Sequence, residues 1–262
     1  MNRLSSIFKK NLSINRKSLV AYLVAGDPSI EESLELLHGF VSAGVDIIEI
    51  GIPFSDPIAE GPIIQSAHHR ALSRKVTFDS IIRTIKLFRH EDQLTPIILM
   101  GYLNTFLMNE SYFEDYHKIG VDGVLIVDAP GEFSLTDLGF KSNSTTSISL
   151  ISPTTEKKRI QRICDQSSGF LYYVTLRGVT GSDNLDLKEI QNNIQNIKSY
   201  TQLPVMAGFG IKDKNDAYKI SQAADGIVVG SALVRMINEE SSTKNYKRIY
   251  NYLSDLVTAI NP

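Results

Sequence analysis

The stretch LVAYLVAGDPSIEESLELLHGFVSAGVDIIEIGI, residues 19–52, decides the fold. It begins and ends with apolar runs, at 19–25 and 46–52, that are rich in Val, Ile and Leu and carry few charges. Such runs are typical of strands that are buried on both faces. Between them, IEESLELLHGFVSAG spaces its apolar residues as one face of a helix does. A strand, a helix and a strand in this order predict a right-handed unit with two parallel strands.

Six further apolar runs repeat this pattern along the chain. They are PIILMGY (96–102), GVLIVDA (123–129), TSISLIS (146–152), GFLYYVT (169–175), LPVMAGF (203–209) and DGIVVGS (225–231). Helical patterns such as KNDAYKISQAA lie between them. Eight such units in 262 residues favour a closed (β/α)8 (TIM) barrel of the α/β class over an open doubly wound sheet. The sequence has no GxGxxG after its first run, which also weakens the open-sheet alternative.

No linker rich in Pro, Gly or Ser divides the chain, so we expect residues 1–262 to form a single barrel domain. Extra helices are expected at the N-terminus, where Leu4 and Phe8 share one face, and after the second strand, within 57–90. The segment KNYKRIYNYLSDLVTAI predicts a final amphipathic helix that packs on the barrel. Its apolar face is expected to contain Ile249, Leu253 and Val257.

Composition excludes several function classes. Lys plus Arg number 27 and Asp plus Glu number 29, so the chain lacks the basic excess expected of nucleic-acid or anionic-membrane binding. No apolar stretch reaches the roughly 18 residues that a membrane span needs, and the N-terminal segment does not resemble a signal peptide. The single cysteine, Cys164, lies in a helical pattern and is interpreted as a buried structural thiol. We therefore expect a cytoplasmic protein.

The chemistry of such a barrel is expected where its strands end. Glu49 lies near the end of the second apolar run, and a buried carboxylate is costly unless it is paired or protonated. It is therefore either part of a salt bridge inside the barrel or an acid with a raised pKa. The following loop contains three prolines, which stiffen it, and two more carboxylates, Asp56 and Glu60. This combination favours a pair of catalytic carboxylates.

Glycines and hydroxyl residues follow the last three runs. RGVTGSDN (177–184) is either a loop that closes over a ligand or an ordinary solvent loop. Gly208-Phe209-Gly210 and Gly230-Ser231 predict a phosphate site built from backbone N–H groups, with plain turn glycines as the alternative. The five histidines show no metal-ligand spacing and are interpreted mostly as helix-surface residues, so no metal site is predicted.

The order of these segments resembles the α chain of tryptophan synthase. The resemblance runs from about Leu19 to Val234, and its most specific string is GIPFSDP. The stretches that carry it are AYLVAGDP (21–28), EIGIPFSDPIAEGPIIQ (49–65), MGYLN (100–104), GVLIVDAP (123–130), LISPTT (150–155), RGVTG (177–181), GFGI (208–211) and GIVVGSALV (226–234). It implies cleavage of indole-3-glycerol phosphate to indole and glyceraldehyde 3-phosphate, without a cofactor. It also implies a pyridoxal-phosphate-dependent β chain as partner, in an α2β2 heterotetramer.

The resemblance also implies site residues. Glu49 would protonate C3 of the indole ring, and Glu60 would act at the indole N–H, where the family has Asp. Backbone N–H groups of Gly181, Gly210, Gly230 and Ser231 would hold the phosphate, and Thr180 would bond to the second carboxylate as its loop closes. The residues that would wall or support the indole pocket are Tyr22, Leu99, Leu125, Tyr172, Phe209 and Val229. Those that would face the β chain are Pro53, Phe54, Asp56, Pro57 and Asn104.

Position 60 departs from the family pattern P-[LI]-A-D-G-P. Glu keeps the charge but moves the carboxylate by about 1 to 1.5 Å, a scale on which misplacement costs on the order of a hundredfold in rate. Two hypotheses follow: a working lyase, or a weak or silent subunit that binds and activates the β chain. A third, another phosphate-binding barrel isomerase, would need a different acid/base pair. The end of the first strand offers only Asp27, which is interpreted as a turn or support residue.

Overall fold

Eight parallel strands close into a barrel in which each strand pairs with its sequence neighbours and β8 pairs with β1. The structure, a computed structural model, describes residues 2–142, 144–174, 187–208, 211 and 213–262. The strands are β1 (Ser18–Val24), β2 (Ile47–Gly51), β3 (Ile97–Gly101), β4 (Gly123–Ile126), β5 (Ser147–Ile151), β6 (Leu171–Val174), β7 (Val205–Gly208) and β8 (Gly226–Val229). Each predicted apolar run overlaps one of them, and only β1 begins before its run, at Ser18, so the predicted (β/α)8 class is confirmed.

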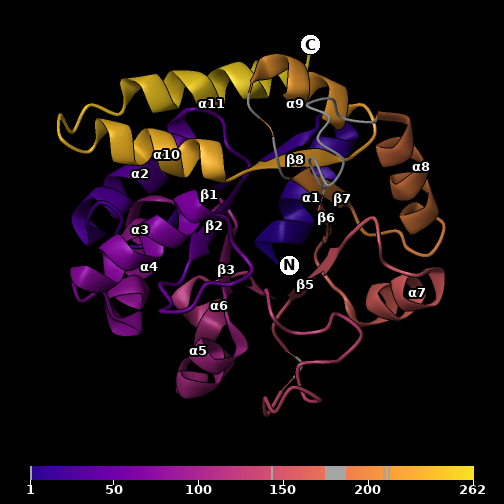
Figure 1. Cartoon of the computed structure of the whole chain (residues 1–262), viewed down its shortest axis with the longest axis horizontal. Coiled ribbons are helices and arrows are strands. Elements are labelled where there is room, and N and C mark those ends of the chain that lie inside the picture. The colour runs from indigo at the N-terminus through magenta and orange to yellow at the C-terminus, as the bar shows by residue number, and fades with distance from the viewer. Residues whose placement is uncertain (1, 143, 175–186, 209–210, 212) are drawn as a thin grey trace.

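The helices surround the barrel on its outside, except for the N-terminal helix, which lies at one of its ends (Figure 1). They are α1 (Arg3–Ser13), α2 (Ile30–Ser42), α3 (Pro62–Ser73), α4 (Phe78–Glu91), α5 (Leu103–Met108), α6 (Tyr116–Ile119), α7 (Lys157–Gln166), α8 (Leu187–Lys198), α9 (Lys214–Ser221), α10 (Ser231–Glu240) and α11 (Lys247–Ile260), with a 3-10 helix at Glu110–Asp115. The N-terminal helix and the second helix after β2 are therefore confirmed. None of the described helices is long and apolar enough to cross a membrane.

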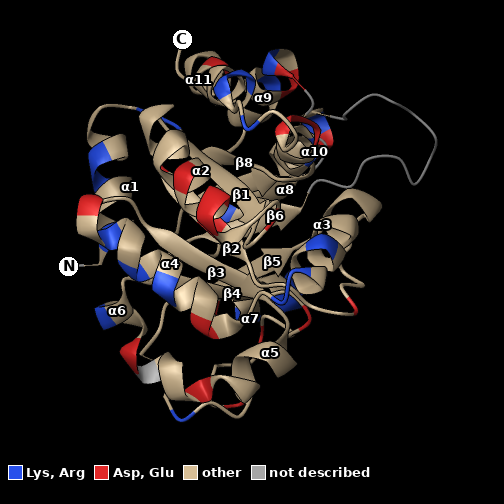
Figure 2. Cartoon of the chain, turned by 90° about the vertical axis from the view of Figure 1, so that its left-hand side faces the viewer, with Lys and Arg blue, Asp and Glu red and all other residues tan. Residues whose placement is uncertain are grey.

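Side chains alternate along each strand between the barrel interior and the surrounding helices. On β1, Leu19, Ala21 and Leu23 belong to the outer core, which the helices cover, while Val20 and Tyr22 belong to inner clusters. The outer core also receives the apolar face of α11, on which Ile249 and Leu253 are fully buried and Val257 only partly. In Figure 2 most charged residues lie on the helices and loops.

The N-terminal helix packs against the interior of the barrel at the ends where the strands begin. Leu4 is buried with Val20 and Phe170, and the ring of Phe8 lies edge-on to Phe170 at 6.0 Å. Asn2 donates hydrogen bonds to the Asp122 carbonyl and the Thr146 hydroxyl, next to the starts of β4 and β5. The opposite end, where the strands finish, remains available for a cavity.

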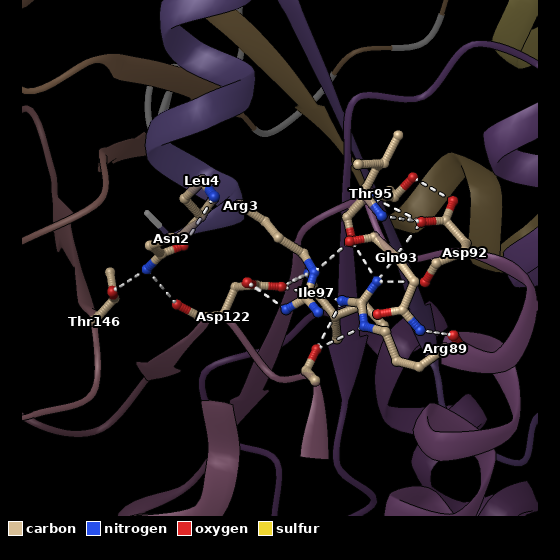
Figure 3. Close-up of polar contacts among 12 residues, drawn as sticks. Asn2, Arg3, Leu4, Arg89, Asp92, Gln93, Thr95, Ile97, Asp122 and Thr146 are labelled. Carbon is tan, nitrogen blue, oxygen red and sulfur yellow. Dashed lines mark hydrogen bonds and ion pairs between the residues drawn. The ribbon is translucent and has the colours of Figure 1, made fainter. Parts of the chain in front are cut away.

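A buried ion-pair network fixes the start of β3 and β4 (Figure 3). The Asp122 carboxylate accepts hydrogen bonds from Arg3, from Arg89 and from the backbone N–H of Ile97, at 2.9 to 3.1 Å. Arg89 also donates to the carbonyls of Gly120 and Thr95. Burial lowers the pKa of Arg89 to about 10, but the guanidinium is still charged at neutral pH. Its charge is compensated by Asp122 at 3.1 Å and by Asp92 at 3.7 Å.

Asp122→Ala should lower the free energy of unfolding by about 3 kcal/mol, because it removes the closer of the two carboxylates that pair with the buried Arg89 and leaves only Asp92, at 3.7 Å. Urea unfolding followed by circular dichroism measures this loss. Asp115→Ala, which removes the exposed ion pair with Lys118, is the control and should leave the unfolding midpoint almost unchanged. Equal losses in the two variants would contradict the assigned role of Asp122.

Candidate active site

A cavity of about 720 Å³ opens where the strands end. Its lining is largely apolar and includes two carboxyl groups, those of Glu49 and Glu60. The apolar and aromatic part comprises Tyr22, Ile63, Ile64, Met100, Val127, Leu150, Tyr172, Val174, Ile211, Val228 and Val229. The small and polar part comprises Gly230, Ser231, Ser152, Thr155 and Arg159. The large apolar lining with a few polar groups is typical of a site for a small aromatic or amphipathic ligand.

Glu49 lies on β2 and faces the interior, with only 1% of its surface exposed. Its Oε1 has no hydrogen-bond partner, and no cation among the described residues forms a salt bridge with it. Burial, and secondarily the charge of Glu60, raises its pKa to about 8. Of the two interpretations of Glu49, the structure supports an acid with a raised pKa, protonated at neutral pH.

Two buried tyrosines adjoin Glu49. Tyr22 lies opposite it in the β1–β2 register, and burial followed by nearby carboxylate charge raises the pKa of both Tyr22 and Tyr172. Each ring lies against a glycine: a Cβ on Gly51 would be 2.2 Å from the Tyr22 Oη, and a Cβ on Gly208 would be 2.4 Å from the Tyr172 Oη. Those two glycines are thus required by the close approach of the tyrosines.

Glu60 reaches the cavity from the loop between β2 and α3 and is 8% exposed. The Tyr102 hydroxyl donates a hydrogen bond to its Oε2 and accepts one from the backbone N–H of Ala59 at 3.0 Å. The Ala59 N–H donates to the Tyr102 oxygen and needs no proton from it. The single hydroxyl proton of Tyr102 is therefore available for donation to Glu60. Burial raises the pKa of Glu60, and the Tyr102 hydrogen bond opposes that rise.

Comparison with known proteins agrees with this geometry. A family model described as "Tryptophan synthase alpha chain" matches residues 8–260. The tryptophan synthase alpha chains of Thioalkalivibrio sulfidiphilus and Acinetobacter baumannii are 44% and 42% identical to this chain. The first alignment covers 91% of both chains, and the second covers 100% of this chain and 99% of its relative. This chain belongs to the tryptophan synthase alpha chain family.

Solved structures support the same family. The crystal structure of tryptophan synthase subunit alpha from Legionella pneumophila superposes on this chain with a TM-score of 0.91 at 36% identity. The superposition covers 100% of this chain and 99% of the other. The resemblance seen in the sequence motifs thus extends over the whole barrel.

Three of the pocket residues expected for a tryptophan synthase alpha chain, Tyr22, Tyr172 and Val229, do line the cavity. Leu99 and Leu125 do not line it. Leu99 is an outward-facing residue of β3, buried against the helices, and Leu125 lies deeper in the barrel interior. Their places at the cavity are taken by Met100, the next residue on β3, and by Val127, two residues further on from Leu125. Phe209 lies outside the described residues.

The predicted phosphate site is described in part. Gly230 and Ser231 line the cavity at the N-terminus of α10, where the helix dipole and N–H groups without intrahelical partners favour an anion. Gly181 and Gly210, and the loop residue Thr180, lie outside the described residues. Arg159, which the sequence analysis did not select, also lines the cavity and forms a two-bond ion pair with Glu132 at 3.0 Å.

The residues expected to face the β chain differ in exposure. Asp56 and Asn104 are exposed, and Pro53 and Phe54 are partly buried. Pro57 is buried, and its carbonyl accepts a hydrogen bond from the Glu60 N–H at 3.1 Å, so it holds its own loop together. The support role predicted for Asp27 is confirmed, because Arg70 donates two hydrogen bonds to its carboxylate at 2.6 and 2.7 Å.

Tyr102 and His68 lie at the site but were not predicted from the sequence as site residues. Tyr102 directly follows β3, and its contact with Glu60 spans 42 residues, which no local pattern indicates. His68 departs from the helix-surface interpretation given for most of the histidines, because it is 1% exposed. Its buried neighbours on α3, Ala67 and Ala71, provided a signal for an inward face. The Nε2 of His68 lies 3.7 Å from the Glu60 Oε1, and burial lowers its pKa to about 4.

Glu49→Gln should change stability in a pH-dependent way. The folded-state pKa of about 8 exceeds the ordinary value of 4.5, so the stability that the Glu49 proton provides is complete below about pH 4.5 and is lost as pH rises to about 8. The variant should therefore gain free energy of unfolding relative to the parent chain across this range, on the order of a few kcal/mol, and hold that gain above pH 8.

Urea unfolding at pH 4, 6, 8 and 9 measures this difference. Glu91→Gln, at an exposed glutamate near the end of α4, is the matched control. A difference between parent and Glu49→Gln that is the same at all four pH values would show that Glu49 is not held protonated.

Proposed function

We propose that this chain cleaves indole-3-glycerol phosphate to indole and glyceraldehyde 3-phosphate. The observation that carries the proposal is that a protonated carboxyl, Glu49, and a second carboxyl, Glu60, line one largely apolar cavity. Membership of the family supports a lyase-type enzyme. An apolar cavity suits an indole ring, and the N-terminus of α10 at Gly230 and Ser231 suits a phosphate.

Breaking the bond between the ring and the glycerol chain requires an acid and a base. Glu49 donates its proton to C3 of the ring, which makes the ring an electron acceptor and leaves Glu49 as a carboxylate. The glycerol hydroxyl next to the ring then loses its proton to Glu49 or to water. Its oxygen forms the aldehyde as the carbon–carbon bond breaks, and the bonding pair restores the neutral indole. Proton transfers suffice for this cleavage, so we assign it no cofactor.

Glu60 supplies the negative charge in this scheme. The ring carries a positive charge after protonation, and a carboxylate at its N–H stabilises that charge or accepts the proton. Tyr102 supports this role, because a hydrogen bond to the ionised form favours that form. The contact also argues against the hypothesis of a silent, purely activating subunit: Glu60 is oriented within the cavity rather than displaced from it.

We propose a pyridoxal-phosphate-dependent β chain as the partner, in an α2β2 assembly that receives the indole. Large apolar side chains are exposed on the loops or helices that follow β2, β3 and β4: Ile58 at 84%, Met108 at 78% and Phe133 at 49%. Ile58 and Met108 lie near the exposed Asp56 and Asn104 in the sequence. Exposed apolar residues at one end of a barrel favour a protein-binding surface at that end.

Indole release from indole-3-glycerol phosphate, measured with the β partner present, tests the proposed function. The parent chain should release indole, with a rate that falls as pH rises through about 8, since Glu49 then ionises. Glu49→Gln should abolish release while far-UV circular dichroism and sedimentation with the β partner stay unchanged. The β partner alone, supplied with indole and serine, is the control. No release by the parent chain, with faster β-chain turnover on its addition, would identify an activator instead.

Glu60→Asp tests whether the site is built for the longer side chain. The shorter carboxylate retracts by about 1 to 1.5 Å from Tyr102, so kcat should fall on the order of a hundredfold. Steady-state kinetics of indole release provide the measurement. Tyr102→Phe, which removes the donor and keeps the ring stacked on Phe54, should lower kcat in the same direction. An increase in kcat for Glu60→Asp would mean that Glu60 is poorly placed in the parent site.

A further inference from the structure

His68 is a buried polar side chain that has no role in the proposed cleavage steps. It lies on α3, and its neighbours on the buried face of that helix, Ala67 and Ala71, are small and apolar. Two cavity groups lie near its Nε2: the Glu60 Oε1 at 3.7 Å and the Tyr22 Oη at 3.5 Å. A side chain with these neighbours is placed to act on the second carboxylate.

The hydrogen bonds of His68 fix its tautomer. The backbone N–H of Phe54 points at the His68 Nδ1 with a distance of 3.0 Å. A backbone N–H can only donate, so Nδ1 is an acceptor and carries no proton. Burial keeps the ring neutral at pH 7, and its single proton is therefore on Nε2. That proton is directed toward Glu60 and Tyr22.

The two oxygens of Glu60 then have different polar neighbours. Oε2 accepts from Tyr102, and Oε1 lies nearest to the His68 Nε2–H. Each donor is itself oriented by a backbone N–H of the loop that carries Glu60, Ala59 for Tyr102 and Phe54 for His68. The loop therefore orients Tyr102 and His68, the two side chains next to its own Glu60 carboxylate. The contact at 3.7 Å is longer than an ordinary hydrogen bond, and contacts of this kind commonly tighten when a substrate binds.

We propose that His68 is a positioning residue for the cleavage, whose Nε2–H holds the Glu60 carboxylate at the oxygen that Tyr102 does not contact. This inference rests on the proposed function. Glu60 has one more rotatable bond than the Asp of the family pattern, and a freely rotating carboxylate is less preorganised. A second donor removes that freedom. The groups that face the ring are Glu60, Tyr22 and the Phe54 N–H, and the neighbouring His69 also influences it.

A double-mutant cycle tests the proposal. His68→Leu should lower kcat for indole release about tenfold and change KM less than about threefold, because a disordered carboxylate affects the reacting state more than ground-state binding. In a Glu60→Gln background the same change should lower kcat less than about twofold, since the carboxylate on which His68 acts is gone. His68→Gln, whose amide can both accept and donate, should recover part of the loss. His69→Leu, at the exposed neighbour, is the matched control.

A tenfold fall with His68→Leu in both backgrounds would overturn the proposal and leave His68 as a packing residue. A second measurement does not depend on turnover: carboxyl ¹³C titration of Glu60 in the full chain. Loss of a donor to the ionised form should raise the pKa of Glu60 in His68→Leu, and an unchanged pKa would also overturn the proposal. If the parent chain releases no indole, the proposed function fails, and the titration still decides the role of His68.

Discussion

The burial of one carboxyl group, that of Glu49, is the constraint on which the site depends. Strand alternation places it inside the barrel, where no cation among the described residues pairs with it and Oε1 has no hydrogen-bond partner. A charge there would be costly, so the group retains its proton near neutral pH. Neighbouring residues make this placement possible: Gly51 and Gly208 leave room for the rings of Tyr22 and Tyr172 beside Glu49.

The two acids of the cavity differ because their surroundings differ. Glu49 lies on a strand, and its Oε1 has no hydrogen-bond partner. Glu60 lies on a loop and accepts a hydrogen bond from the Tyr102 hydroxyl. The Tyr102 hydrogen bond opposes the rise that burial causes in the pKa of Glu60, and Glu49 Oε1 has no such partner. Two carboxyls in such different environments commonly take acid and charge-stabilising roles. The same loop is tied back to the barrel: the ring of Phe54 stacks on that of Tyr102 at 4.6 Å. The position of the loop and that of its carboxylate are therefore coupled.

Much of the fold could be predicted from the sequence because eight apolar runs of strand length are a strong and repeated signal. The direction in which each residue points was harder to predict. In a strand that is buried on both faces, the inward-facing and the outward-facing positions are both apolar. The pattern around Leu99 and Met100 therefore does not reveal which of them faces the cavity. Glu49 was predictable because a charge in such a run is an exception. Tyr102 contacts Glu60 across 42 residues and His68 contacts the Phe54 N–H across 14, and only the folded chain brings these groups together.

The longer side chain at position 60 is best understood together with its supports. An isolated Glu in place of Asp would have one more torsion to order and would place its oxygens further from the backbone. Here Tyr102 contacts one oxygen and His68 approaches the other, and both donors are oriented by N–H groups of the loop itself. A change in the loop would move the carboxylate and its donors together, so their relative geometry would be preserved. A Glu at position 60 is therefore compatible with a well-oriented carboxylate, because Tyr102, His68 and the loop form one hydrogen-bonded unit around it.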